Sequence, residues 1–299
     1  MQKEQKGQVT VALVTIIEEE FDAVCRIFKL KQHHPGGLFK VRKVTPTGVY
    51  DILATRSDDW GNTPAGETVA DIIEDFSPRY IVLIGIAGGV RRGNKRDGVR
   101  LGDVVIPNYI EYSELKKLNE RKISRRSFPI DHPSYYLRRS VAEPIKKDLP
   151  KLWAKRIAKK RPGSGTPKAH IGNLVAGETL LGDPKADYQK QVLKHYHRAI
   201  AVDMESMGIG REVYHQRHSP YYNPQYLVVR GISDYVYVDE SGKFSATKKK
   251  KKKAPADNQS TRDKWRVYAA ESAAAFASVM VESLLREFGK DYGVRKGKT

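Results

Sequence analysis

"YIVLIGIAGG", residues 80–89, is the stretch that best indicates the fold of this chain. Its first seven residues are apolar apart from one glycine, and its last three are small. An apolar run of this kind is typical of a strand buried on both faces, as in the parallel sheets of α/β proteins. Glycines at the end of such a strand predict a tight turn where the backbone can approach a ligand.

Buried strands and amphipathic helices are expected to alternate on both sides of this stretch. The expected strands are residues 9–17, 50–56, 80–89, 102–112, 169–177, 199–205 and 226–229. The expected helices are residues 21–30, 66–76, 133–159, 205–216 and 265–288. This order predicts an α/β fold with a mixed, largely parallel central sheet flanked by helices.

We expect one catalytic domain over residues 1–299, with two additions to the α/β core. Residues 113–170 are polar and basic, and we interpret them as an insertion. Residues 240–262 follow the last strand and include six adjacent lysines, Lys248 to Lys253. Because like charges repel one another, this loop is expected to be disordered.

Composition limits the class of protein. The 54 Lys and Arg against 35 Asp and Glu give a net charge of +19, which favours anionic partners such as nucleotides, nucleic acid or acidic membranes. The single cysteine, Cys25, excludes an intramolecular disulfide and a cysteine-rich zinc site, and it fits a reducing cytosol. No apolar run approaches 18 residues and no signal peptide is visible, so we expect a cytoplasmic protein.

Four predicted strand ends carry acidic residues or glycines. "GIAGG" (85–89) suits an anion- or sugar-binding turn, or simply a tight strand exit. "VDMES" (202–206) places two carboxylates together, either to bind a ligand or to cap the next helix. "RGISD" (230–234) suits a general acid held by a serine, or a structural ion pair. "EEE" (18–20) alone indicates only a solvated helix start.

Together and in this order, these motifs resemble the nucleoside phosphorylase and nucleosidase superfamily. The resemblance covers about residues 9 to 290 and is most specific in "GIAGGV…LGDVVIP", "VDMES" and "VVRGISD". The motif layout is close to that of the methylthioadenosine/S-adenosylhomocysteine nucleosidases. The ending "RGISDY…W…YAAESAAAFA" is similar to the nucleosidase effector domains of bacterial anti-phage and NLR-like immune proteins, some of which cleave the glycosidic bond of ATP.

The resemblance implies four catalytic residues. Asp234 matches the general acid that protonates N7 of a purine, and Ser233 matches the serine that orients it. Glu20 matches the glutamate that positions the attacking water, and Arg230 matches an arginine near that water. It implies neither a metal nor another cofactor.

The resemblance also implies a set of substrate-binding residues. Glu205 matches the glutamate that binds the ribose 2′ and 3′ hydroxyls, and Met204 matches the methionine that packs against the sugar. The full expected set is Ala87, Gly88, Leu180, Leu181, Asp203, Met204 and Glu205. Three positions depart from the family: Asp203 replaces a more usual glutamate, Leu180 an aromatic that stacks on adenine, and Ile86 a small hydroxyl residue of the methylthioadenosine enzymes.

Hydrolysis is favoured over phosphorolysis. The superfamily's phosphorylases need arginines after the first strand and before the central glycine turn, but "TIIEEEF" and "YIVLIGIAGG" have none there. Three glutamates would repel a phosphate nucleophile, whereas a carboxylate can activate water. A phosphate-dependent purine nucleoside phosphorylase is the alternative enzyme.

The basic residues near the predicted site favour a phosphorylated substrate such as ATP, although a solvated basic loop is an alternative for each cluster. Candidate phosphate-binding residues are Arg91, Arg92, Arg125 and Arg126, with Lys95, Arg96, Lys116 and Lys117 close by. The sequence thus predicts hydrolysis of an adenine nucleotide or nucleoside, with release of the free base and without membrane or nucleic-acid partners. The resemblance implies a role in anti-phage defence and a homo-oligomer. A methylthioadenosine/S-adenosylhomocysteine nucleosidase, a non-catalytic nucleotide-binding module and a nucleic-acid-binding protein are the alternatives.

Overall fold

The structure is a computed structural model. It describes residues 9–32, 39–45, 48–91, 98–114, 116–119, 122–125, 132–148, 150–183, 186–217, 222–238 and 258–288. Within these residues no helix is both long and apolar enough to cross a membrane.

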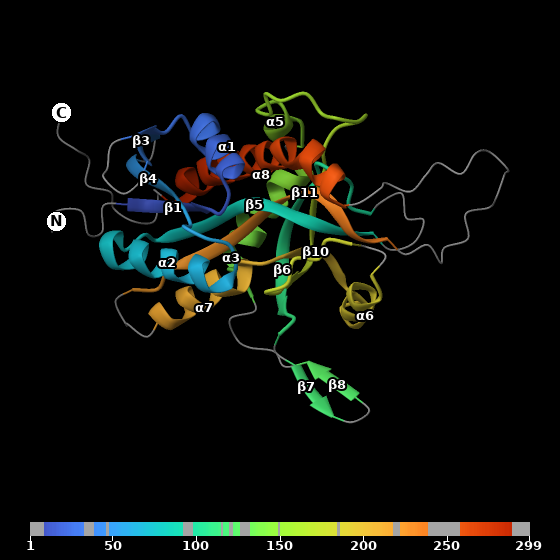
Figure 1. Cartoon of the computed structure of the whole chain (residues 1–299). Coiled ribbons are helices and arrows are strands. Elements are labelled where there is room, and N and C mark those ends of the chain that lie inside the picture. The colour runs from blue at the N-terminus through green and yellow to red at the C-terminus, as the bar shows by residue number, and fades with distance from the viewer. Residues whose placement is uncertain are drawn as a thin grey trace.

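One large sheet forms the centre of the molecule (Figure 1). Its strands are β1 (Val9–Thr15), β2 (Lys31–Gln32), β3 (Phe39–Thr45), β4 (Gly48–Arg56), β5 (Tyr80–Arg91), β6 (Val104–Tyr112), β9 (Ala169–Ala176), β10 (Ala199–Asp203) and β11 (Gln225–Val238). In the described part of the chain these nine strands have the order β10-β9-β6-β11-β5-β1-β4-β3-β2. A separate hairpin, β7 (Lys116–Asn119) and β8 (Lys122–Arg125), projects from the body.

Half of this sheet closes into a barrel. β5 is parallel to β1 and to β11, and β11 is antiparallel to β6. β9 lies between β6 and β10 and is parallel to both. β10 also pairs antiparallel with β5, which completes a ring of five strands. The long strands β5 and β11 therefore belong both to the open sheet and to the barrel, and their second halves lie at the place where the ring closes.

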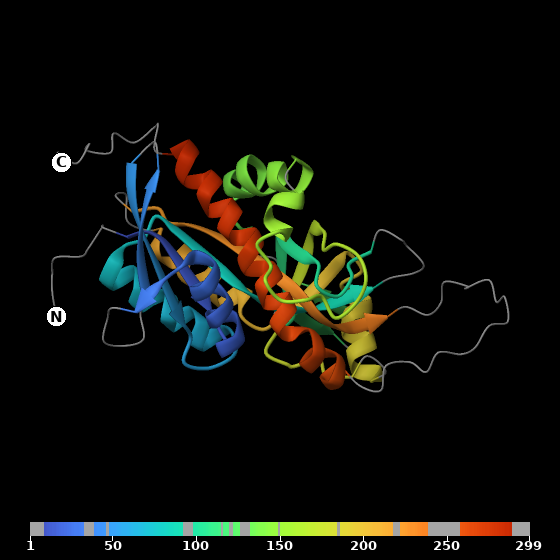
Figure 2. The ribbon, with the colours of Figure 1, turned by 90° about the horizontal axis from the view of Figure 1, so that it is seen from above.

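Helices cover both faces of the sheet (Figures 1 and 2). One face carries α1 (Glu18–Phe28), α8 (Asn258–Phe288) and the short segments α3 (Tyr135–Leu137), a π-helical turn (Arg138–Ala142), α4 (Glu143–Asp148) and α5 (Pro150–Ala154). The other face carries α2 (Asn62–Phe76) and α7 (Ser206–Gln216). α6 (Asp187–His195) packs against the barrel.

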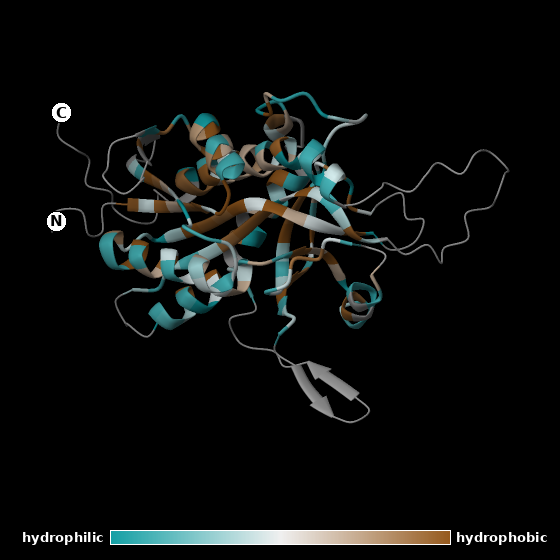
Figure 3. Cartoon of the chain, viewed as in Figure 1, coloured by the Kyte–Doolittle hydropathy of each residue, from teal (hydrophilic) through white to brown (hydrophobic). Residues whose placement is uncertain are grey.

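The alternation of side chains along β1 shows why its sequence is apolar throughout. Val11 and Leu13 pack with α1 and α8, whereas Ala12 and Val14 pack with α2 and α7. Both faces of the strand are therefore buried, as expected for the centre of a parallel sheet. Figure 3 shows the same distribution, with hydrophobic colour concentrated on the central strands.

Small residues let α8 lie directly on β11. Ala269, Ala270, Ala273 and Ala274 are buried in this contact. A Cβ atom at Gly231 of β11 would overlap the backbone of Ala269, so only glycine allows this close approach. The contact fixes the beginning of α8 beside the second half of β11.

The fold class is confirmed, but three sequence predictions about individual elements are wrong. The strand expected at residues 226–229 does not end there, because β11 continues to Val238. α8 begins at Asn258 rather than Trp265, so the last five residues of the predicted 240–262 loop are helical; Lys248 to Lys253 lie outside the described residues. The helix expected at 133–159 is a series of short segments, and α6 was not predicted.

Candidate active site

Strand pairing brings three of the four sequence motifs together. Gly88 of β5 is the pairing partner of both Val202 in β10 and Asp234 in β11. The register between β5 and β11 shifts at Ser233, which has no partner residue on β5. Such a bulge turns neighbouring side chains away from the regular alternation, so it allows Ser233 and Asp234 to serve one site.

A pocket lies over this junction. All but one of the predicted catalytic and substrate-binding residues line it: Glu20, Ala87, Gly88, Leu180, Leu181, Asp203, Met204, Glu205, Ser233 and Asp234. The exception, Arg230, is fully buried beneath the pocket and contacts two of the lining residues. Segments separated by more than 200 residues thus form one site.

Asp234 has the environment expected of a general acid. It is 6% exposed, and the hydroxyl of Ser233 donates a hydrogen bond of 2.6 Å to its Oδ1. Burial raises the pKa of the Asp234 carboxyl, while the Ser233 hydrogen bond and the positive charge of Arg262 lower it. The net direction is upward, so the proton is retained to higher pH than on a solvated aspartate.

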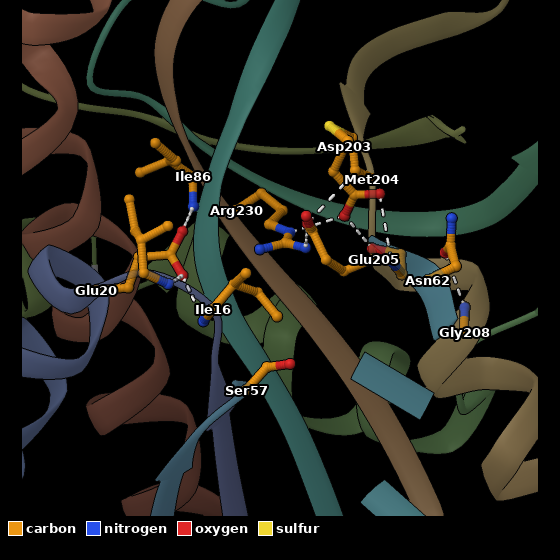
Figure 4. A network of polar contacts seen from close by, with 12 residues as sticks. Ile16, Glu20, Ser57, Asn62, Ile86, Asp203, Met204, Glu205, Gly208 and Arg230 are labelled. Atoms are coloured by element: carbon orange, nitrogen blue, oxygen red, sulfur yellow. Dashed lines mark hydrogen bonds and ion pairs between the residues drawn. The ribbon is translucent and has the colours of Figure 1, made fainter. Parts of the chain in front are cut away.

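Glu20 receives three backbone hydrogen bonds at the start of α1 (Figure 4). Its Oε2 accepts from the N–H groups of Ile16 (2.8 Å) and Ile17 (3.2 Å), and its Oε1 accepts from Ile86 (2.7 Å). Burial raises the pKa of Glu20, and the charge of Arg230 and the three N–H groups lower it. These bonds hold the carboxylate in one orientation at the edge of the pocket.

Arg230 joins the two acidic residues of "VDMES" (Figure 4). Its Nε donates to Oδ2 of Asp203 and its Nη2 donates to Oε2 of Glu205, both at 2.8 Å. Burial raises the pKa of Glu205 to about 7; Arg230 opposes this shift, and the charges of Asp203 and Glu20 add to it. The structural ion pair considered for "RGISD" therefore exists, but it joins Arg230 to Asp203 and Glu205 rather than to Asp234.

One nitrogen of Arg230 has no partner in these ion pairs. Its Nη1 is buried and has no hydrogen-bond partner among the described residues. A Cβ atom built on Gly85 would overlap both this Nη1 and Oε1 of Glu20, so the two groups face the same small space beside β5. A buried donor without a protein partner next to an oriented carboxylate is the arrangement expected of a water-binding position.

This geometry gives a prediction for Gly85→Ala. The added methyl group must displace Arg230 or Glu20, and overpacking of this kind costs roughly 1–3 kcal/mol of stability. We expect a lower melting temperature and a loss of catalytic activity larger than the loss of folded protein. Activity per folded molecule, measured well below the melting temperature, checks this. Wild-type activity per folded molecule would show that the space beside Gly85 has no part in the reaction.

The lining also includes residues that were not predicted, among them Trp60, Gln259 and Arg262. Trp60 is 58% exposed at the pocket mouth, near Leu180, which is 50% exposed. Asn62 fixes this mouth, since its Nδ2 donates to the backbone oxygen of Gly177 and to Oε1 of Glu178. The only sequence signal for Trp60 was an aromatic in the polar turn "SDDWGN".

The candidate phosphate-binding arginines lie apart from this pocket or outside the described part. Arg91 is exposed, its guanidinium lies over the ring of Tyr235, and it does not line the pocket. Arg92, Arg126 and the side chain of Arg125 lie outside the described residues. In the described part, no group of three or more His, Cys, Asp and Glu residues could hold a metal ion.

Comparison with known proteins places this geometry in a family. The chain is 24% identical over 202 residues to a 5′-methylthioadenosine/S-adenosylhomocysteine nucleosidase from Shewanella loihica, covering 66% of this chain and 74% of the relative. A nucleosidase of the same name from Colwellia psychrerythraea, solved in complex with adenine, has a TM-score of 0.63 at 17% identity and covers 94% of this chain and 97% of its own.

A second structural neighbour has another name. The futalosine hydrolase of Helicobacter pylori has a TM-score of 0.61 at 16% identity, covering 92% of this chain and 98% of its own. At these identities the solved structures support the fold alone. The family model of the phosphorylase superfamily matches residues 10–276, nearly the whole described core. The chain therefore belongs to the phosphorylase superfamily.

Proposed function

We propose that this protein hydrolyses the N-glycosidic bond of an adenine nucleotide or nucleoside and releases the free base. The contacts of Glu20 carry the choice of hydrolysis. Three backbone N–H groups that converge on one point form a natural anion-binding position. The chain's own carboxylate already occupies it, so a phosphate nucleophile would meet this negative charge and find the three backbone donors already used.

In this proposal the attacking water lies between Glu20 and Arg230. Nη1 of Arg230 supplies a donor to the oxygen of the water, and the Glu20 carboxylate accepts one of its protons. The water would then be oriented toward the anomeric carbon with its lone pair free. This role uses the one nitrogen of Arg230 that the ion pairs with Asp203 and Glu205 leave unused.

Glu205 is suited to bind the ribose hydroxyls. Its contacts with Nη2 of Arg230 and the N–H of Met204 both use Oε2, which leaves Oε1 available in the pocket. Negative charge on Glu205 and Glu20 also favours the positive charge that develops on the sugar as the bond breaks. Asp234 delivers its proton to N7 of the departing purine, and the water supplies the oxygen of the free sugar.

The names of the relatives support the purine part of this proposal. The Shewanella relative is a 5′-methylthioadenosine/S-adenosylhomocysteine nucleosidase, and the Colwellia structure is a complex with adenine. The departures at Ile86 and Leu180 favour a substrate other than methylthioadenosine, and the net charge of +19 favours an anionic one. Cleavage of ATP in anti-phage defence, by a cytoplasmic homo-oligomer, is the specific form of the proposal.

A product assay tests the proposal. Purified protein is incubated with adenosine, AMP, ATP and methylthioadenosine, each with and without inorganic phosphate, and the products are identified by mass. We expect free adenine and the free sugar, at a rate that does not depend on phosphate. A phosphate-dependent sugar 1-phosphate would instead identify a phosphorylase, and binding without any base release would identify a nucleotide-binding module.

A further inference from the structure

The first turns of α8 bring a positive charge into the pocket. Gln259 and Arg262 line it together with Asp234, and Arg262 is the only lysine or arginine among the described residues of the lining. Its side chain is partly exposed, and it forms no ion pair or hydrogen bond with another described residue. Arg262 is therefore placed to contact a ligand rather than to stabilise the fold.

The other acidic groups of the pocket have partners of their own. Glu20 is held by three backbone N–H groups, and Asp203 and Glu205 are held by Arg230. Arg262 is thus not needed to compensate these three carboxylates. The remaining one, Asp234, is the group that must carry a proton to act as an acid, and a nearby cation works against that protonation.

A negatively charged substrate would remove this conflict. Arginine presents two parallel N–H donors that match the oxygens of a phosphate, and such charge-assisted pairs are stronger than neutral hydrogen bonds. Once Arg262 is paired with a phosphate, its charge no longer opposes the proton on Asp234. Binding of an anionic substrate at Arg262 would therefore be coupled to protonation of Asp234.

We propose that Arg262, assisted by Gln259, binds a phosphate group of the substrate and makes the enzyme prefer adenine nucleotides over adenosine. The proposal deepens the proposed function and rests on it for the identity of the adenine. It assigns the preference to a side chain on α8, not to the basic clusters of residues 91–96 and 116–126.

The test compares Arg262→Gln with a matched control, Lys264→Gln. Lys264 is exposed on the same helix and does not line the pocket, so its replacement removes the same charge from the same region without touching the site. The measured quantity is the ratio of kcat/KM for AMP to that for adenosine. We expect Arg262→Gln to lower this ratio about 10- to 100-fold, and Lys264→Gln to leave it near the wild-type value. Arg262→Lys should retain part of the preference.

The pH profile separates phosphate binding from an effect on the acid alone. The polar and charged groups that line the pocket with Asp234 are Ser233 beside it on β11 and Arg262 on α8, with Glu20, Asp203 and Glu205 as the other carboxyl groups. The charge of Arg262 lowers the pKa of Asp234, so in Arg262→Gln the fall of the adenosine rate at alkaline pH should move to higher pH. In that alkaline range the variant should hydrolyse adenosine faster than wild type. If Arg262→Gln lowers kcat/KM equally for AMP and adenosine, or for neither, the proposal is wrong.

Binding measurements keep this test independent of turnover. A C-nucleoside analogue of adenosine and its 5′-monophosphate have a carbon–carbon glycosidic bond that is not hydrolysed, so their dissociation constants can be measured by calorimetry. We expect the monophosphate to bind more tightly to wild type, and Arg262→Gln to abolish the difference. Absence of base release from every substrate would overturn the proposed function. Equal affinities of wild type for the two analogues would overturn the role of Arg262.

Discussion

Replacing Asp234 by Asn is expected to lower the rate of adenine release by about 10²- to 10⁴-fold without unfolding the protein, because an amide cannot deliver a proton to N7. The side chains have nearly the same shape, and the Ser233 hydroxyl that bonds Asp234 can equally donate to the amide oxygen of Asn. Single-turnover release of adenine, with the melting temperature as a check of folding, measures the effect. A variant with wild-type turnover would show that Asp234 is not the acid.

Ser233→Ala tests the contribution of the hydroxyl group that holds Asp234. The hydroxyl of Ser233 favours the ionised form of Asp234, so its removal raises the pKa of the acid further. The proton is then retained to higher pH, but the carboxyl is no longer held in position. We expect a smaller loss of rate than for Asp234→Asn and an alkaline limb that lies at higher pH. The residual rate of Asp234→Asn should show no such fall at alkaline pH.

The sheet could be predicted because its central strands are buried on both faces. β1 and β5 have no polar face, and therefore their apolar runs are visible in the sequence without any knowledge of their neighbours. The candidate catalytic and substrate-binding residues follow these apolar runs directly in the sequence. The superfamily resemblance then supplied roles that spacing alone does not give, such as the contact between Glu205 and a sugar.

The length of β11 was missed because polar and small residues interrupt its apolar run after Val229. Gly231 and Asp234 have low strand propensity, and they separate this run from the strand-prone "YVYV" at residues 235–238. Pairing with β5 along the wall of the barrel supplies the hydrogen bonds that hold these residues extended. Closure of the barrel is a long-range property, and the local sequence does not show that the two apolar stretches on either side of "RGISD" form one continuous strand.

The missed pocket residues have a similar cause. Trp60 lies on a loop whose position depends on the contact between Asn62 and Glu178, residues separated by more than a hundred positions. Arg262 precedes the apolar part of α8, and its polar surroundings gave no reason to extend the helix. Side chains that enter a site from a loop or a helix end are placed by tertiary contacts.

Replacing Arg230 by Met is expected to destabilise the protein by about 3–5 kcal/mol, the cost of leaving buried carboxylates without their cation. Arg230 is fully buried, and it donates to both Asp203 and Glu205. Methionine fills much of the same volume, so loss of packing contributes little. The free energy of unfolding, from urea titration at pH 5 and pH 8, measures the effect.

The pH dependence identifies charge as the cause. Burial already raises the pKa of Glu205 to about 7 against the opposing charge of Arg230, and removal of Arg230 raises it further. The folded variant then binds its proton more tightly than the unfolded chain, whose Glu pKa is about 4.3. Stability is therefore lost as pH rises, and the deficit should be larger at pH 8 than at pH 5. Adding Asp203→Asn and Glu205→Gln removes the unpaired charges, and this triple variant should recover most of the lost stability and its pH dependence, but no activity. A triple variant as unstable as Arg230→Met would show that Arg230 stabilises the protein through the shape of its guanidinium and not through its charge.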